Sequence, residues 1–384
     1  MTAIFEQPSP WQRARHVFTG FDGLLLAAMA VLGAIGLVAM YSAGYDHGTR
    51  FVDHARNMAL ALAVTFVVAQ VPPHKMERLA VPLYTAGIVL LIAVALFGIT
   101  RKGATRWLNI GFVIQPSEIM KIAVPLMLAW WFQKREGQRS AADFAAAALL
   151  LALPVLLVAR QPDLGTALLI LAAGLFVIFF AGLSWRLVLP AALLVGAGVV
   201  ALVTGQEELC GEGVRWPVLR EYQQHRVCTL LDPARDPLGK GFHILQGMIA
   251  IGSGGVGGKG FMQGTQTHLE FIPERTTDFI FAAFCEEFGF VGVVVLLVAL
   301  SALILRGLAI AADAPTVFSR LLAGAVTMGF FTYAFVNMGM VSGILPVVGV
   351  PLPFVSYGGT AMVMLGLGLG ILMSVARSRQ LMRS

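Results

Sequence analysis

Asp278 is the first candidate in this sequence for acid–base chemistry. It opens a long apolar stretch and follows Glu274 and Arg275 in the polar segment "FIPERTTDF". An aspartate at the start of a helix can simply cap it by accepting a backbone hydrogen bond. A carboxylate that faces a cleft containing cations can instead act as a general base beside a phosphate-bearing substrate. A long polar loop delivers this residue, so we predict that Asp278 is a catalytic base.

A second group of ionisable residues lies in "RKGATRWLNIGFVIQPSEIMKI", where a polar stretch leads into another apolar run. Glu118 and Lys121 are three residues apart, so they share one helical face and can pair. A charge at membrane depth costs about 2.5 kcal/mol or more and is therefore usually paired or functional. For this pair, a structural salt bridge and substrate binding are equally good interpretations. Lys102 and Arg106, just outside the run, are better candidates for substrate binding.

Two further features have structural explanations beside chemical ones. Asp163, in the turn "ARQPDLGT", can cap a helix that begins near Leu164, or it can help to bind a substrate. The stretch "IGSGGVGGKG" contains the spacing GxGxxG, but the preceding residues do not predict a strand. We interpret it as a flexible hinge rather than a dinucleotide site. The histidines are scattered and establish no metal-ligand set, so a metal requirement stays open.

The composition indicates which elements must position these residues. The chain has 384 residues, of which 58% are hydrophobic and 12% charged, and its mean hydropathy is +0.80. In soluble domains roughly a quarter of the residues are charged. The chain is therefore predicted to be an all-α polytopic membrane protein with about ten transmembrane helices of roughly 20 residues each. Its net charge of +6 is spread between apolar runs without a basic face, which argues against binding nucleic acid.

The apolar runs also predict the topology. Lysine and arginine are enriched in the short loops on the side of both termini, which places the termini in the cytoplasm. The first run shows no signal-peptide cleavage site and is expected to remain as an anchor. The predicted spans are residues 21–42, 54–71, 79–98, 116–132, 142–159, 165–181, 187–204, 278–305, 320–341 and 358–376.

A long polar segment, residues 205–277, separates the seventh and eighth spans and is predicted to be a large extracytoplasmic loop. The whole chain, residues 1–384, is expected to form one membrane domain that includes this loop. The pieces "HILQGMIAIGSGG" and "THLEFIPERTTDF" are apolar and regular enough to predict short helices along the outer membrane surface.

Cys210 and Cys228 both lie in this loop. Outside the cytoplasm two neighbouring thiols are prone to oxidise, so we predict a disulfide bond between them. Two unpaired cysteines are the alternative, because bonding geometry cannot be judged from spacing.

Five stretches of the sequence resemble the SEDS family (shape, elongation, division and sporulation) of bacterial cell-wall proteins. "PER" at 273–275 and "LPVVGVPLP" at 345–353 are similar to its elongation (RodA-like) branch rather than to its division branch. Thr276 departs from the family, which commonly has histidine there. The stretches that carry the resemblance are "LEFIPERTTDFIFA", "QPSEIMKI", "RQPDLGTA", "DPLGKGFHILQGMIAIGSGG" and "NMGMVSGILPVVGVPLPFVSYGG".

The resemblance implies a peptidoglycan glycosyltransferase that polymerises the lipid-linked precursor lipid II outside the inner membrane during cell elongation. It implies that Asp278 is the catalytic base and that a class B penicillin-binding protein is the partner. The departing lipid diphosphate needs cations. The first candidates are Lys102, Arg106 and Lys121, and the second are Lys259 and Arg275. A divalent cation could share this task.

Two other functions remain open at this point. The protein could be a lipid II flippase, although its charges concentrate toward one side rather than along a route through the bilayer. It could also be a non-catalytic scaffold for a penicillin-binding protein. For such a partner, the small residues of "GAVTMGFF" at 324–331 offer a helix-packing surface, and packing within the bundle is an equally good interpretation.

Overall fold

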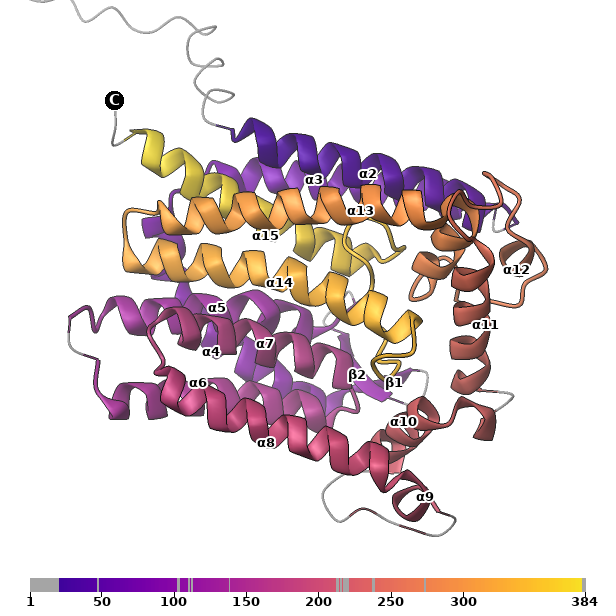
Figure 1. Ribbon diagram of the computed structural model, residues 1–384. Helices are drawn as coiled ribbons and strands as arrows, with labels where there is room; N and C mark the ends of the chain where they lie inside the picture. The colour runs from indigo at the N-terminus through magenta and orange to yellow at the C-terminus, as the bar shows by residue number, and fades with distance from the viewer. Residues whose placement is uncertain are drawn as a thin grey trace, which may run out of the picture.

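The structure is a computed structural model, and Figure 1 shows its long helices side by side in one bundle. It describes residues 21–46, 48–101, 104–109, 111, 113–137, 139–211, 214, 216, 221–236, 239–272 and 274–381. Lys102, one of the predicted substrate-binding residues, lies outside this described part.

Each of the ten predicted spans coincides with a long helix. Within the described residues, eight helices are long and apolar enough to cross a membrane. The other two predicted spans are α7, which has 17 residues, and α5, whose apolar run is interrupted by charges. The helices are α2 (Gly23–Ala43), α3 (Arg50–Ala69), α4 (Pro73–Phe97), α5 (Pro116–Gln133), α6 (Ala141–Arg160), α7 (Leu164–Phe180), α8 (Trp185–Thr204), α13 (Ile280–Ala312), α14 (Val317–Val341) and α15 (Gly359–Leu381).

Small residues allow the central helices to approach closely. A β-carbon at Gly366 of α15 would collide with the backbone of Ala61 in α3, and one at Gly370 would collide with the side chain of Val68. The hydroxyl of Thr65 in α3 donates a hydrogen bond of 2.8 Å to the carbonyl of Gly366. In membranes, where lipid tails are as apolar as leucine, such close packing and interhelical hydrogen bonds hold helices together.

The strands and the short helices gather at one end of the bundle, opposite the C-terminal end of α15 (Figure 1). A small antiparallel sheet, which was not predicted from the sequence, lies there; its strands are β1 (Ile99–Arg101), β2 (Ala104–Asn109) and β3 (Val113–Ile114). The helical pieces are α9 (Gln206–Leu209), α10 (Glu221–Leu231), the 3-10 turn η1 (Pro233–Arg235), α11 (Lys240–Ser253) and α12 (Thr265–His268). We call this the loop end.

The two helices predicted for the long loop have different outcomes. The first is confirmed as α11, which runs across the ends of the bundle helices (Figure 1). The second prediction, over "THLEFIPERTTDF", is wrong because α12 ends at His268 and turns follow. Glu270 has a positive φ of 61°, a conformation that interrupts a helix.

The glycine-rich segment 254–260 is not a free hinge. The backbone N–H groups of Phe290 and Val291 in α13 donate to the carbonyls of Gly255 and Val256, at 2.9 and 3.1 Å. α13 is kinked at Gly289, where φ is 59°, and a side chain at Gly258 would overlap its backbone. The glycines therefore permit close packing on the kinked helix.

Candidate active site

A polar cavity of about 570 Å³ lies at the loop end, among β2, α5, α7, α10, α11, the residues just before α13 and the segment that joins α14 to α15. Four of the predicted site residues line it, and they come from parts of the chain that are far apart in sequence. They are Arg106, Glu118, Asp163 and Asp278.

Asp278 lies just before α13, but it is not the cap of that helix. The N-cap position is Phe279, and no side chain caps there. The amide of Asn337, which is fully buried, donates to the backbone carbonyls of both Asp278 and Val350, at 2.9 and 2.7 Å. The opposing Gly349 has a φ of +76°, and a β-carbon there would lie 3.3 Å from Oδ2 of Asp278. Fixed backbone and open space leave this carboxylate directed into the cavity.

Asp163 has the capping role that was one of its two interpretations, and it also contacts two side chains of the cavity. Its carboxylate caps α7 by accepting the backbone N–H of Thr166 at 3.3 Å. It also accepts a 2.9 Å hydrogen bond from the Gln115 amide and lies 3.6 Å from Nη1 of Arg106. Asp163 thus holds both neighbouring side chains at the wall of the cavity.

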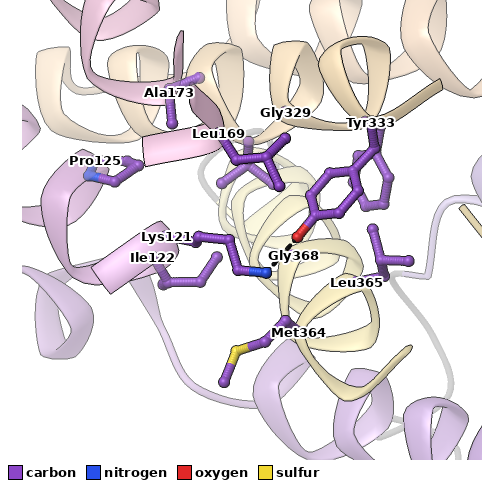
Figure 2. Close-up of a pocket in the computed structure, with 13 residues that line it drawn as sticks. Lys121, Ile122, Pro125, Leu169, Ala173, Gly329, Tyr333, Met364, Leu365 and Gly368 are labelled. Atoms are coloured by element: carbon purple, nitrogen blue, oxygen red, sulfur yellow. Dashed lines mark hydrogen bonds between the residues drawn. The ribbon is translucent and has the colours of Figure 1, made fainter. Parts of the chain in front are cut away.

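Glu118 and Lys121 form the ion pair that their spacing predicted. Nζ of Lys121 lies 2.7 Å from Oε1 of Glu118 and donates a 2.6 Å hydrogen bond to the hydroxyl of Tyr333. Figure 2 shows Lys121 and Tyr333 pointing toward each other beside a second pocket, which is apolar and about 50 Å³ in volume. Glu118 faces the polar cavity instead, and its Oε2 is buried without a hydrogen-bond partner. The pair therefore stands between the two spaces.

Like Lys121, two further predicted cations do not line the polar cavity. Lys259 pairs with the buried Glu286 at 2.7 Å. Arg275 is only 2% exposed and binds the carboxylate of Asp46 and the carbonyl of Ala43. Both residues anchor the segment between α11 and α13 to the bundle.

Arg226, which was not predicted from the sequence, enters the cavity from α10. Its Nη1 donates a 3.0 Å hydrogen bond to the carbonyl of Val347. Burial lowers the pKa of its guanidinium, and repulsion from Arg106 acts in the same direction. Arg226 is the single arginine of α10, but the neighbouring sequence does not indicate that α10 folds over the cavity.

Cys210 and Cys228 are joined by a disulfide bond in the structure, with their Cα atoms 5.6 Å apart. The bond ties α10 to the turn that follows α9. Within the described part of the chain, no three or more His, Cys, Asp and Glu side chains form a group arranged for a metal ion.

The fold and this site define a multi-pass membrane protein with a carboxylate-bearing cavity at one end of its helical bundle. The chain belongs to the FtsW/RodA/SpoVE family of cell cycle proteins, whose family model matches residues 22–381, and this confirms the predicted family.

Its relatives include enzymes of the cell wall. It is 49% identical to the peptidoglycan glycosyltransferase MrdB of Escherichia coli K12, over 94% of each chain. It is 33% identical to the peptidoglycan glycosyltransferase RodA of Treponema pallidum, over 94% of this chain and 98% of the relative.

Solved structures are similar as well. One, from a study of polymerisation and crosslinking by a peptidoglycan synthase complex, has a TM-score of 0.76 and 33% identity, over 94% of this chain and 99% of the other. The rod shape-determining protein RodA of Thermus thermophilus gives a TM-score of 0.68 at 30% identity, over 94% and 98% of the two chains.

Proposed function

We propose that this protein is a peptidoglycan glycosyltransferase that polymerises lipid II into glycan strands during cell elongation. The observation that carries the proposal is the carboxylate of Asp278, which is held by its backbone in a polar cavity at the loop end. The names of the relatives support the same activity.

A carboxylate that acts as a general base suits an inverting transfer. The acceptor sugar hydroxyl attacks the anomeric carbon of the donor while Asp278 takes the hydroxyl proton. The bond from that carbon to the lipid diphosphate breaks, and the diphosphate leaves with the electron pair. An attack from the face opposite the leaving group converts the α-linkage of the donor into a β-linkage.

The other side chains of the cavity hold the reactants in place. Arg106 is fixed by Asp163 and can meet negative charge, while Glu118 lines the same cavity and can accept a hydrogen bond from a sugar hydroxyl. Lys121 pairs with Glu118 from the side away from the cavity and does not line the cavity itself. Such groups act best when they are oriented before the substrate arrives.

We further propose that both termini lie in the cytoplasm and that the cavity faces the outside of the inner membrane. The distribution of lysine and arginine in the short loops supports this orientation. A lipid-anchored sugar would then reach Asp278 at the outer membrane surface.

A class B penicillin-binding protein is the proposed partner, since new glycan strands need crosslinking where they emerge. The small residues at the start of the segment 324–331 pack within the bundle. Gly324 packs against Phe180 of α7, and Ala325 is fully buried, so these small residues serve the bundle itself. Phe331 and Phe335 are 40% and 51% exposed and remain available on the same helix.

Lipid II polymerisation by the purified full-length chain in liposomes, with and without the partner, tests the proposal. We expect glycan strands from the wild type. Transport of lipid II without strand growth would favour a flippase. Strand growth that depends on the partner alone and survives Asp278→Asn would favour a scaffold.

A further inference from the structure

Arg226 is a cation in the cavity to which the proposed mechanism has assigned no role. It reaches the cavity from α10, which belongs to the long loop rather than to a span. Its guanidinium lies 5.9 Å from the ring centroid of Tyr222, and its hydrogen bond to Val347 fixes one edge. A guanidinium has five N–H donors, so this bond leaves others for a ligand.

The electrostatic surroundings of Arg226 are mixed. Asp163 and Asp278 attract its charge, whereas Arg106 repels it, so the two arginines are near enough to interact. Nε of Arg106 is buried without a hydrogen-bond partner in the described structure. Two guanidinium groups with donors to spare that line one cavity are suited to bind a multivalent anion.

The carboxylates of the cavity limit where that anion can sit. Glu118 is paired with Lys121, and Asp163 with Arg106. Glu274 is exposed and accepts a 2.7 Å hydrogen bond from Thr277. Asp278 lines the same cavity as Arg226 and attracts its charge, so an anion bound at Arg226 competes with this carboxylate.

We propose that Arg226 binds the diphosphate that leaves the donor sugar and that its charge partner changes from Asp278 to this diphosphate during the reaction. The proposal rests on the function proposed above. When the acceptor oxygen bonds to the anomeric carbon, the acceptor's proton passes to Asp278 and neutralises it. The diphosphate gains the electron pair of the broken bond in the same step. Arg226 stays protonated throughout. The negative charge near it on Asp278 is lost as the one on the diphosphate increases.

Equilibrium binding of the product lipid undecaprenyl diphosphate to the full-length protein tests this role without turnover. Arg226→Gln should weaken binding roughly tenfold or more, since it removes a charge-assisted hydrogen bond. Asp278→Asn should strengthen binding, because it removes the competing carboxylate. Glu221→Gln, at an exposed position of the same helix, is the matched control and should change nothing. Uncharged undecaprenol should bind equally to all four proteins.

Two results would overturn the assignment. One is wild-type affinity of Arg226→Gln for the diphosphate. The other is an equal loss of undecaprenol and undecaprenyl diphosphate, which would mean that Arg226 only supports the Val347 carbonyl. If Arg226→Gln does not fold, Arg226→Lys decides, since lysine lacks the planar fork and should bind several-fold more weakly; unchanged affinity rejects the proposal. A wild type that binds the diphosphate but makes no glycan would instead refute the proposed function.

Discussion

Two aspartates show how the backbone around a residue decides its role. Asp163 is the N-cap of α7, and one of its carboxylate oxygens accepts a hydrogen bond from the Thr166 N–H. Asp278 precedes the N-cap position of α13, which Phe279 occupies, and its side chain lines the cavity. Similar positions near a helix start therefore yield an orienting group in one case and the proposed base in the other.

The first prediction concerns this base. Asp278→Asn keeps the shape of the side chain but cannot take up a proton, so polymerisation should fall about 10²–10⁴-fold. The melting temperature should stay near that of the wild type, since no cap is lost. Gel analysis of glycan strands made by the purified protein measures the activity. Asp53→Asn, a carboxylate paired with Arg56 away from the cavity, is the control and should remain active.

The second prediction concerns the pair in the wall of the cavity. Replacing either Glu118 by Gln or Lys121 by Met leaves a buried group without its partner and should destabilise the fold by roughly 3–5 kcal/mol. The double variant should recover stability more than activity. Tyr333→Phe removes only the second partner of Lys121 and should cost about 1.5–3 kcal/mol. Thermal unfolding in detergent checks these effects; single variants with wild-type stability would contradict the buried pairing.

The sequence predicted part of this site. The pairing of Glu118 with Lys121 follows from helical spacing, and Asp278 follows from its place at an apolar boundary. Lys259 and Arg275 were expected beside the diphosphate, but neither lines the cavity, because each has a carboxylate partner that spacing does not reveal. For Arg275 that partner, Asp46, is 229 residues away. Arg226 was missed for the same reason, since only the folded loop carries it over the cavity.

At the scale of elements, the segment between α14 and α15 shapes the site through its glycine. Gly349 combines a left-handed backbone with space beside Asp278, and Asn337 ties this segment to the start of α13. The position of Asp278 relative to the Gly349 segment of the cavity wall is thus set by backbone groups rather than by flexible side chains.

The third prediction is that Gly349→Ala impairs activity more than it impairs folding. The new β-carbon costs about 1–2 kcal/mol in the left-handed region and crowds the carboxylate of Asp278. Gly182→Ala is a matched control, since Gly182 has a φ of +101° and a β-carbon there would meet no other atom within 4 Å. Both variants should lose similar stability, and only Gly349→Ala should lose most of its polymerisation rate. Equal activities would show that this space is not needed.

At the scale of the whole molecule, hydropathy predicted the bundle and failed at the loop end. A membrane span can be recognised from a continuous run of apolar residues alone, because these residues face lipid or other helices. The sheet around β2 and the path of α10 depend instead on contacts between distant segments, such as the hydrogen bond from Arg226 to Val347 across 121 residues. The cavity at the loop end is therefore formed by long-range contacts that hydropathy does not predict.

The disulfide bond is a covalent link at the loop end, and the last prediction concerns its contribution to stability. Cys210 and Cys228 are 18 residues apart, and closing a loop of this size stabilises a fold by about 3 kcal/mol in the chain-entropy model. Changing both residues to serine should therefore lower the melting temperature of the protein. Most polymerase activity should remain, because neither sulfur lines the cavity and the hydrogen bond from Arg226 to Val347 still holds α10 in place. Reducing agent should lower the melting temperature of the wild type and leave that of the serine variant unchanged. Peptide mapping of protein from native membranes under non-reducing conditions is the direct check, and free thiols at both positions would end the prediction.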